Sequence, residues 1–578
     1  MTEASPATDF SVAVLGEFVR LGVRNVVLSP GSRSQALALA AAEFDRAGLL
    51  ALNVRIDERV AGFLALGIAV ETRAPVLVIT TSGTAVGNLL PAVLEAHHSG
   101  VPLILLTADR PEELRGIGSN QTTEQLGMFG DFVRFAREVE APSHSVFDPD
   151  YPRELAKAAF SAAAGHSSTP GPVHLNLAFR EPLSGPFDPR DLADVVPGTA
   201  SGPVTAGVSF FIGAAPATIV IAGHTAGESA EAAARALGAP LVAEVSSGAH
   251  FGPNLVVAYR ELLGDLEFGG RVRRVIVFGH PTLSREVPAI IGRTDVETIV
   301  VRGRAVDAYN PDRRVSRFVD GLTVEGAPDD SPEARAWLGS WVTASRAILE
   351  TQDSVEAAGA RTDDRATVAE FTRAQLAVFR EPVSRRMLVD AVWQKTWPHD
   401  RLIFGASRLI READRVVGGK KIPVHSNRGL SGIDGTIATA TGIALASQAG
   451  ERSADTVSAR TSSAGHGVAG MTRVLLGDLA LLHDVGALLI GDKEPAPRMQ
   501  LIVGNDGGGT IFDSLEVAAT AHHGSFDRVL YTPQSVKLSA LAEGYGWDYL
   551  LARNRGELDE ALSTGVGRTI IEVPLPRE

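Results

Sequence analysis

The first 180 residues of this 578-residue chain alternate between short β-rich apolar runs and segments with the apolar spacing of helices. Strands that are joined through helices lie parallel, and the helices cover both faces of the sheet. The alternation therefore predicts a doubly wound parallel sheet. We expect its strands at 25–29, 50–56, 76–80 and 101–107, and its helices at 9–21, 34–46, 59–70 and 85–95.

The same alternation recurs twice, with strands expected at 218–222, 241–245, 274–279 and 297–301, and then at 402–404, 422–425, 473–476 and 499–503. A chain of this length needs more than one core. A Pro/Gly-rich stretch at 181–204 and a polar stretch at 352–365 separate the units and are predicted linkers. We expect an α/β protein with three doubly wound parallel-sheet domains, at 1–185, 205–350 and 380–578. A Ser/Ala/Gly-rich segment at 450–470 is interpreted as a surface insertion.

Composition excludes several kinds of chemistry. The chain has no cysteine, so disulfides, thiolate catalysis and zinc–thiolate sites are excluded. A net charge of −14 argues against a general nucleic-acid binder, whose surface would be basic. The first residues carry no signal-peptide pattern, and no apolar run is long enough to span a membrane. We expect a cytoplasmic protein with no membrane span and no nucleic-acid partner.

Two apolar runs in the last unit each end at a small residue followed by an oxygen ligand. Gly477-Asp478-Leu479 ends one run, and Asn505 follows 27 residues after Asp478, before Gly507 and Gly508. Mg²⁺ takes oxygen ligands and usually shares them with a diphosphate, and glycines let backbone N–H groups approach phosphate oxygens. A carboxylate, an amide oxygen and a backbone carbonyl predict a metal–diphosphate site. The alternative is a pair of ordinary polar residues at strand ends.

Glu58 is the first candidate for acid–base chemistry. It ends an expected strand and enters a helix at 60–67 that is apolar nearly all round, so the helix is expected to be buried. A carboxyl group buried against such a helix has a raised pKa and can hold a proton near neutrality. The alternatives are an acid that stabilises the helix N-terminus and an ion pair with Arg55 or Arg59.

Two arginines lie in glycine-rich loops that open helices. Arg33 follows a Gly/Ser loop at a helix start, which is an anion-binding geometry. Arg428 precedes a glycine-dense turn at 431–435, which suggests close approach of the backbone to a ligand. For Arg33 the alternative is an ordinary surface arginine. For the turn after Arg428 the alternative is a plain tight loop.

Taken in order, these motifs resemble the 2-succinyl-5-enolpyruvyl-6-hydroxy-3-cyclohexene-1-carboxylate (SEPHCHC) synthase family of thiamine diphosphate enzymes. The resemblance extends from about residue 10 to 575. Its motifs are Ser-Pro-Gly-Ser-Arg-Ser at 29–34, Asp-Glu-Arg at 57–59, Ser-Gly-Thr-Ala at 82–85, Thr-Ala-Asp-Arg-Pro at 107–111, Asn-Gln at 120–121, Ser-Asn-Arg-Gly at 426–429, Ser-Gly-Ile-Asp-Gly at 431–435, Gly-Asp-Leu at 477–479 and Asn-Asp-Gly-Gly-Gly-Thr-Ile-Phe at 505–512.

The resemblance implies pyrimidine-binding, central and diphosphate-binding domains, in that order. It implies a homodimer or homotetramer with active sites between subunits, and thiamine diphosphate with Mg²⁺, for which Mn²⁺ can substitute. Glu58 would bind the aminopyrimidine ring and Ile433 would be the apolar wedge that bends the cofactor. The remaining cofactor contacts would be Gly477, Asp478, Leu479, Asn505, Gly507 and Gly508, with Asp478, Asn505 and the Gly507 carbonyl on the metal.

The implied reaction decarboxylates 2-oxoglutarate and adds the resulting succinyl semialdehyde carbanion to isochorismate by 1,4-addition, in menaquinone biosynthesis. The implied substrate contacts are Ser32, Arg33, Asn120, Gln121, Ser407, Arg411 and Arg428, with Ile511, Phe512 and Leu515 as an apolar wall. Ala406 departs from the family pattern, in which Asn is expected. The alternative is another thiamine diphosphate decarboxylase or carboligase, similar to acetolactate synthase, or a non-catalytic homologue that binds the cofactor.

Overall fold

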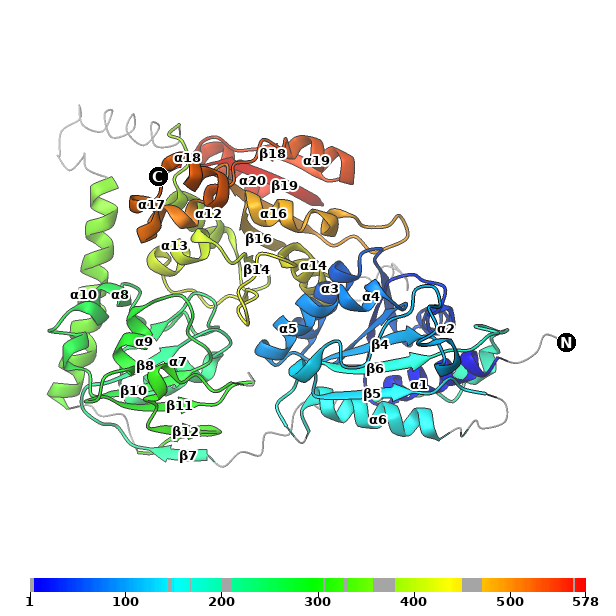
Figure 1. The fold of residues 1–578 in the computed structure, drawn as a ribbon. Helices are drawn as coiled ribbons and strands as arrows, with labels where there is room; N and C mark the ends of the chain where they lie inside the picture. Colours follow the sequence, from blue (N-terminus) through cyan, green and yellow to red (C-terminus); the bar gives the residue numbers. More distant parts are fainter. Residues whose placement is uncertain are drawn as a thin grey trace, which may run out of the picture.

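The structure is a computed structural model that describes residues 5–143, 148, 150–166, 168–199, 209–304, 307–326, 331–356, 380–449, 470–564 and 567–577. Three α/β units lie in a triangle, with the first at the right of Figure 1 in blue and cyan, the second at the left in green, and the third above both in yellow to red. Every strand pairing in the three main sheets is parallel. This confirms the predicted fold class.

The first unit holds a six-stranded sheet in the order β2-β1-β3-β4-β6-β5. The four expected strands are present, and two more, β5 and β6, were not predicted. Its strands are β1 (Asn25–Leu28), β2 (Ala51–Val54), β3 (Val76–Thr80), β4 (Leu103–Asp109), β5 (Phe135–Val139) and β6 (Val173–Ala178). Its helices are α1 (Pro6–Arg20), α2 (Gln35–Arg46), α3 (Glu58–Thr72), α4 (Thr84–Gly87), α5 (Leu90–Ser99) and α6 (Tyr151–Ala164).

One predicted helix is wrong in its extent. The sequence predicted a continuous helix at 85–95, and the structure has two helices, α4 and α5, that meet near residue 89. Pro91 lies in the first turn of α5. Proline fits the first turn of a helix, where its missing N–H has no helical partner, but it breaks a helix interior.

The second unit holds a five-stranded sheet in the order β12-β11-β10-β8-β9 and a separate parallel pair of β7 and β13. Its strands are β7 (Ser209–Ile212), β8 (Thr218–Ala222), β9 (Leu241–Ala243), β10 (Arg274–Phe278), β11 (Glu297–Val301), β12 (Arg317–Val319) and β13 (Gly321–Val324). Its helices are α7 (Glu228–Leu237), α8 (Tyr259–Gly264), α9 (Glu286–Ile291) and α10 (Pro332–Glu356).

The third unit repeats the topology of the first. Its sheet has the order β15-β14-β16-β17-β19-β18, which is the same sequence of crossovers. Its strands are β14 (Arg401–Phe404), β15 (Val424–His425), β16 (Thr472–Gly477), β17 (Met499–Asn505), β18 (Asp548–Leu551) and β19 (Arg568–Pro574). Its helices are α12 (Arg385–Lys395), α13 (Arg408–Val416), α14 (Thr436–Ser447), α16 (Asp478–His483), α17 (Glu516–Thr520), α18 (His523–Phe526), α19 (Leu538–Tyr545) and α20 (Arg555–Thr564).

Helices α3 and α14 join the first and third units into one apolar core. Residues 60–69 and 436–445 of these helices are buried. Glycines allow the close contact, because a Cβ atom at Gly67 would lie 2.0 Å from the carbonyl oxygen of Thr439, and one at Gly442 would lie 2.1 Å from that of Leu64. Backbones in such contact fix the two units relative to each other.

The predicted linker at 181–204 is not a free connection. Ser5 donates to the carbonyl of Pro182 at 2.8 Å, the N–H of Gly185 donates to Thr8 at 2.9 Å, and Val195 is buried in the first core. The predicted polar stretch at 352–365 begins inside α10, and its part after 356 lies outside the described residues. The predicted insertion at 450–470 lies outside them too, apart from its last residue. No helix of the described chain is both long and apolar enough to cross a membrane.

Candidate active site

Asp478 and Asn505 leave the same edge of the third sheet side by side. Gly477 and Gly504 are paired in the neighbouring parallel strands β16 and β17, so the residue after each glycine projects from the same sheet edge. Asp478 is 4% exposed. Burial, followed by the charge of Asp506, raises the pKa of the Asp478 carboxyl to about 6. A buried carboxyl beside a second one, with a pKa shifted this way, fits a site for a cation.

The side-chain amide of Asn505 has a fixed orientation. Its Nδ2 donates to Oε1 of Glu572 at 2.7 Å, and its Oδ1 accepts from the backbone N–H of Gly507 at 3.2 Å. The other oxygen of Glu572 accepts from the hydroxyl of Tyr549 at 2.6 Å. Since the nitrogen is held by Glu572, the oxygen faces the glycine loop, and oxygen is the atom that a hard cation requires.

The glycine loop after Asn505 has no room for side chains. Gly507 has a φ of +77°, and a Cβ atom there would lie 2.8 Å from the hydroxyl oxygen of Tyr531. That hydroxyl donates to the carbonyl of Asp506 at 2.8 Å, and a Cβ atom at Gly508 would lie 2.3 Å from the carbonyl of Tyr531. The loop therefore presents bare backbone at this edge, as a phosphate-binding loop does.

The donor set here fits a magnesium ion. It consists of one carboxylate, one amide oxygen and backbone carbonyls, which are all oxygen ligands. Among the residues that the structure describes, no group of three or more His, Asp and Glu side chains could hold a metal ion. A site with a single protein carboxylate is typical of Mg²⁺ that shares its coordination sphere with phosphate oxygens and water.

Glu58 begins α3, but Asp57 caps the helix. The side chain of Asp57 accepts from the backbone N–H groups of Arg59 and Val60 at 2.8 and 3.3 Å. Glu58 is half-buried, so its predicted burial is wrong for this single chain. The physical reason is that α3 enters the core only from Val60 onward, and its first turn lies at the rim of the sheet.

Neither neighbouring arginine pairs with Glu58. Arg55 pairs with Glu494 at 3.4 Å, and Arg59 lies 3.8 Å from Asp484. Within the described ranges, no ion pair of Glu58 is formed, so the ion-pair alternative is wrong. Among the described residues the Glu58 carboxyl therefore has no cationic partner, while the adjacent Arg59 donates to the carbonyl of His483 in the third unit at 3.0 Å.

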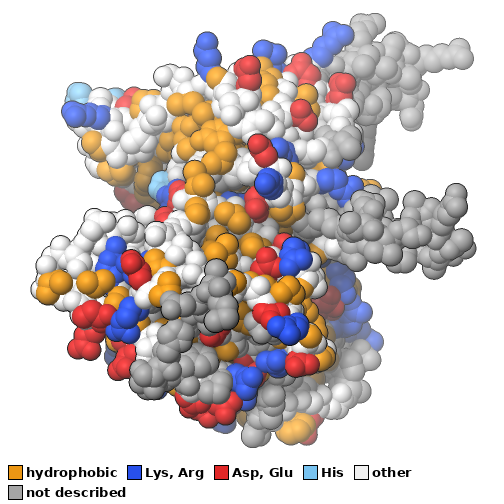
Figure 2. Space-filling view, turned by 90° about the vertical axis from the view of Figure 1, so that its right-hand side faces the viewer, with side chains coloured by type: hydrophobic (Ala, Val, Ile, Leu, Met, Phe, Trp, Pro, Cys, Tyr) orange, Lys and Arg blue, Asp and Glu red, His pale blue; other side chains and the backbone are white. Residues whose placement is uncertain are grey.

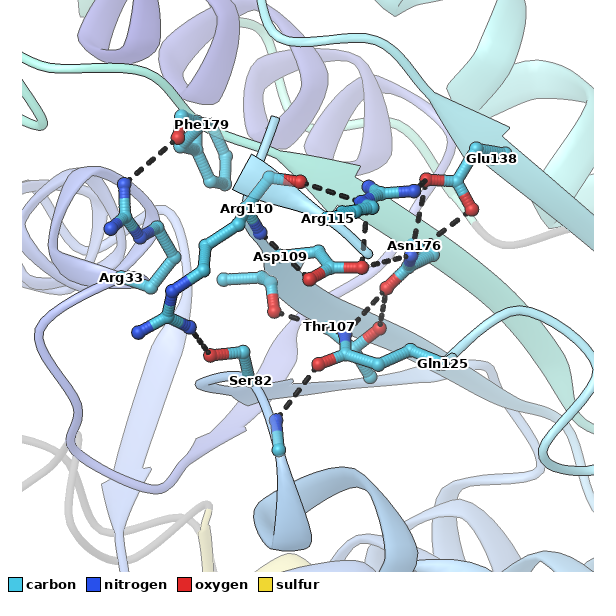
Figure 3. Close-up of polar contacts among 12 residues, drawn as sticks. Arg33, Ser82, Thr107, Asp109, Arg110, Arg115, Gln125, Glu138, Asn176 and Phe179 are labelled. Carbon is cyan, nitrogen blue, oxygen red and sulfur yellow. Dashed lines mark hydrogen bonds and ion pairs between the residues drawn. The ribbon is translucent and has the colours of Figure 1, made fainter. Parts of the chain in front are cut away.

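The first unit has a cationic site at its strand ends (Figure 3). Arg33 donates to the carbonyl of Phe179 at 3.1 Å, and Arg110 donates to the hydroxyl of Ser82 at 2.7 Å and to the carbonyl of Gln121 at 2.6 Å. Burial, followed by the charge of Arg110, lowers the pKa of Arg33. Among the described residues neither guanidinium forms an ion pair with a carboxylate, so both can attract an anion.

Arg110 was not assigned a role from the sequence. It directly follows Asp109, the last residue of β4, at the same sheet edge as Arg33, and that position is the signal that could have found it. The loop that carries Arg33 runs against the residue that follows β3, because a Cβ atom at Gly31 would lie 2.2 Å from Cβ of Thr81.

A buried polar network holds this edge in place (Figure 3). Asn176 donates to Asp109 at 2.8 Å and accepts from Gln125 at 2.7 Å and from Thr107 at 2.9 Å. Gln125 in turn accepts from the N–H of Gly83 at 2.8 Å. Because each member is satisfied by the others, the strand ends that carry the arginines are rigid.

Arg411 and Arg428 form a second cationic group, between the second and third units. Arg428 is 4% exposed and donates from Nε to Oγ1 of Thr282 at 2.9 Å, and from Nη2 to the carbonyl of Thr282 at 3.2 Å. Arg411 donates to the carbonyl of Ser407, which caps α13. Burial lowers the pKa of both arginines.

The other predicted site residues lie around these three groups. Ile433 is 38% exposed, just before α14. Ile511, Phe512 and Leu515 are half-buried beyond the glycine loop, while Ser32, Asn120 and Gln121 are exposed at the edge of the first sheet. In the part of the chain that the structure describes, no hydrogen bond or ion pair joins Glu58 or Arg33 to the pair of Asp478 and Asn505.

Comparison with known proteins identifies the class and the family. Residues 9–128 match the family model described as "Thiamine pyrophosphate enzyme, N-terminal TPP binding domain". The crystal structure of benzoylformate decarboxylase from Polynucleobacter necessarius shares the fold, with a TM-score of 0.61, 15% identity, and coverage of 100% of this chain and 99% of that one. Fold and matched domain together define a thiamine diphosphate enzyme.

Two curated relatives are named 2-succinyl-5-enolpyruvyl-6-hydroxy-3-cyclohexene-1-carboxylate synthase. The protein of Leifsonia xyli subsp. xyli is 56% identical, and that of Clavibacter michiganensis subsp. michiganensis is 55% identical. Each comparison covers 99% of this chain and 97% of the relative. The chain belongs to the SEPHCHC synthase family, as its motifs predicted.

Proposed function

We propose that the protein is a SEPHCHC synthase of menaquinone biosynthesis. It decarboxylates 2-oxoglutarate and joins the remaining succinyl semialdehyde unit to isochorismate by 1,4-addition. The observation that supports this function is the presence of two arginine groups, around Arg33 and around the buried Arg428, in a chain of this family. Both substrates are multiply anionic, and arginine binds carboxylates with two parallel hydrogen bonds.

The cofactor is thiamine diphosphate with Mg²⁺. Asp478, the amide oxygen of Asn505 and the carbonyl of Gly507 hold the metal, and Mn²⁺ can replace it because it prefers the same oxygen ligands. The backbone around Gly477, Leu479 and Gly508 binds the diphosphate. When bound, thiamine diphosphate supplies the electron sink that decarboxylation of a 2-oxoacid needs.

Glu58 would hold a proton against a ring nitrogen of the cofactor, and Ile433 would pack against the cofactor as an apolar contact. A carboxyl group suits this task because it can donate and accept the same proton. Arg33, Gln121, Ser32 and Asn120 bind substrate from the first unit. From the third unit, Ser407, Arg411 and Arg428 bind substrate, while Ile511, Phe512 and Leu515 exclude water.

The proposed domains are 1–185 for pyrimidine binding, 205–350 for the central domain and 380–578 for diphosphate binding. Each active site combines the first domain of one subunit with the last domain of a second copy, in a homodimer or homotetramer. Apolar side chains beside the site support this, since Ile56 is 71% exposed next to Asp57 and Ile433 is also exposed. Figure 2 shows hydrophobic side chains in a column that crosses the junction between two lobes. Such a surface is typical of a subunit interface. A cytoplasmic location stays a prediction.

The test is turnover of the wild-type protein with thiamine diphosphate, Mg²⁺, 2-oxoglutarate and isochorismate, followed by loss of isochorismate absorbance. We expect turnover only when all four are present. Pyruvate in place of 2-oxoglutarate is the control for the acetolactate synthase-like alternative, since it has no second carboxylate for the arginines to bind. Turnover with pyruvate alone, and none with the expected pair, would overturn the proposal. A protein that binds the cofactor fully but is silent with both oxoacids would favour the non-catalytic homologue.

A further inference from the structure

The side chain of Arg428, in the third unit, is hydrogen-bonded to the central domain. Both of its hydrogen bonds go to Thr282, which lies in the loop after β10 of the central domain, 146 residues away in the sequence. Nε and Nη2 bind the hydroxyl and the carbonyl of this one residue. An arginine side chain has many rotamers, and two bonds to a single rigid partner select one of them.

The loop that holds Thr282 is itself held by a buried carboxylate. The backbone N–H groups of Thr282 and Leu283 both donate to Oε1 of Glu244, each at 2.6 Å. Glu244 lies directly after β9 and is buried. A chain of hydrogen bonds therefore runs from Glu244 through the backbone of the loop to the guanidinium of Arg428.

The helix that carries Arg411 is tied to the same corner of the central domain. Asp414 of α13 accepts from the backbone N–H of Val245 at 2.7 Å and from the hydroxyl of Tyr259 at 2.6 Å, and it pairs with Arg260. Val245 is the neighbour of Glu244. The central-domain backbone around Glu244 and Val245 thus contacts both the helix that carries Arg411 and the loop that supports Arg428.

We propose that Glu244 and Thr282 are positioning residues that hold Arg428 in the geometry in which it binds a substrate carboxylate, so the central domain shares in substrate binding. The inference rests on the proposed function, because it takes Arg428 to be a substrate contact. A binding group is effective only when its own rotamer is fixed by a supporting layer of residues. Neither supporting residue touches substrate.

Thr282→Val is the first test, because it removes the hydroxyl and keeps the size and the backbone carbonyl. We expect the KM for 2-oxoglutarate or for isochorismate to rise about tenfold, the effect of losing one hydrogen bond to a charged group, with a much smaller change in kcat. Thr282→Ser, which restores the hydroxyl, returns KM to near the wild-type value. Thr298→Val is the matched control, since Thr298 is a buried central-domain threonine whose hydroxyl has no hydrogen-bond partner among the described residues.

Glu244 supplies a second pair of variants. Glu244→Gln keeps an acceptor for the two backbone N–H groups and should preserve KM, whereas Glu244→Met removes it and should raise KM as Thr282→Val does. A wild type that turns over both substrates while Thr282→Val and Thr298→Val show equal KM values would overturn the positioning role alone. Equal KM values for Glu244→Gln and Glu244→Met would also overturn it. A wild type that consumes neither substrate would instead defeat the proposed function.

Discussion

Glu572 fixes the side-chain amide of Asn505, because its Oε1 accepts from Nδ2 of Asn505 at 2.7 Å. The carboxylate lies on β19 and the amide at the end of the neighbouring strand β17. An unassisted amide can present either its oxygen or its nitrogen to a ligand, and only the oxygen can bind a cation. The relationship makes Glu572 a support for the proposed metal site that the motifs did not include.

Replacing Glu572 should therefore lower the affinity of the proposed metal site, although Glu572 is not itself one of the proposed metal ligands. We expect Glu572→Met to lower the affinity for thiamine diphosphate and Mg²⁺ about 10- to 100-fold, the usual effect of losing a partner that orients a ligand. Titration calorimetry with thiamine diphosphate at a fixed Mg²⁺ concentration measures this affinity. Tyr549→Phe is the control, since it removes only the hydroxyl that binds the other oxygen of Glu572. Equal affinities of wild type and Glu572→Met would contradict the prediction.

Glu58→Gln should lower turnover while leaving the binding of thiamine diphosphate largely unchanged. The amide has the size of the carboxyl group but cannot hold and release a proton, so turnover should fall about 10²- to 10⁴-fold. The dissociation constant of thiamine diphosphate should change little, and calorimetry measures it beside the steady-state rate. Glu43→Gln, at a half-buried position of α2 where the side chain pairs with Arg46, is the matched control. A Glu58→Gln protein with wild-type turnover would exclude Glu58 from the chemistry.

The division of the site between two subunits predicts complementation. Glu58→Gln and Asp478→Asn should each be inactive alone. Each variant carries a different tag, so that heterodimers of the two can be purified. If the sites lie between chains, each heterodimer contains one site with both substitutions and one intact site. Such heterodimers should recover about half of the wild-type activity. If both residues of a site came from the same chain, purified heterodimers would be as inactive as the parent proteins.

We expect the protein to lose stability in mild acid, because burial lowers the pKa of several histidines. Burial lowers the pKa of His174 from 6.5 to about 4, and the ring contacts the hydroxyl of Thr107 at 2.7 Å. Between these pH values the unfolded chain binds a proton that the folded protein does not, so stability falls as the pH falls through this window. Burial lowers the pKa of His224 to about 3 and of His425 to about 4, which adds to the same trend.

The thermal unfolding midpoint measured at pH 7.5 and at pH 5.0 checks this prediction. We expect a lower midpoint at pH 5.0, and a smaller difference in His174→Asn. His166→Asn, at an exposed position, should keep the full difference. A midpoint that rises on acidification would show that carboxyl groups with raised pKa values outweigh the histidines.

The sequence predicted most of the fold because buried parallel strands are continuous apolar runs. Strands β3, β8 and β11 have the predicted bounds. It missed β5 and β18, which lie at sheet edges and carry exposed polar residues, so their pattern is weak. It also missed the neighbouring strands β6 and β19, although both are interior and largely buried. The packing of the predicted linker against α1 depends on single hydrogen bonds, which no local pattern reveals.

The candidate site was predictable where it consists of strand ends. Asp478 and Asn505 are neighbours because adjacent parallel strands end at one edge, which the apolar runs already indicate. The half-burial of Glu58 was not predictable, since it depends on where α3 meets the core. The contact of Arg428 with Thr282 joins residues 146 positions apart in different units, and no periodicity marks it.

The stoichiometry of the reaction is the sharpest test of whether the protein couples decarboxylation of 2-oxoglutarate to consumption of isochorismate. The wild-type protein is incubated with thiamine diphosphate, Mg²⁺, isochorismate and 2-oxoglutarate labelled in the carboxyl group next to the keto carbon. We expect one molecule of labelled carbon dioxide for each molecule of isochorismate consumed. When the cofactor is omitted, we expect no carbon dioxide release and no loss of isochorismate. Carbon dioxide release from 2-oxoglutarate or pyruvate with no loss of isochorismate would contradict this coupling.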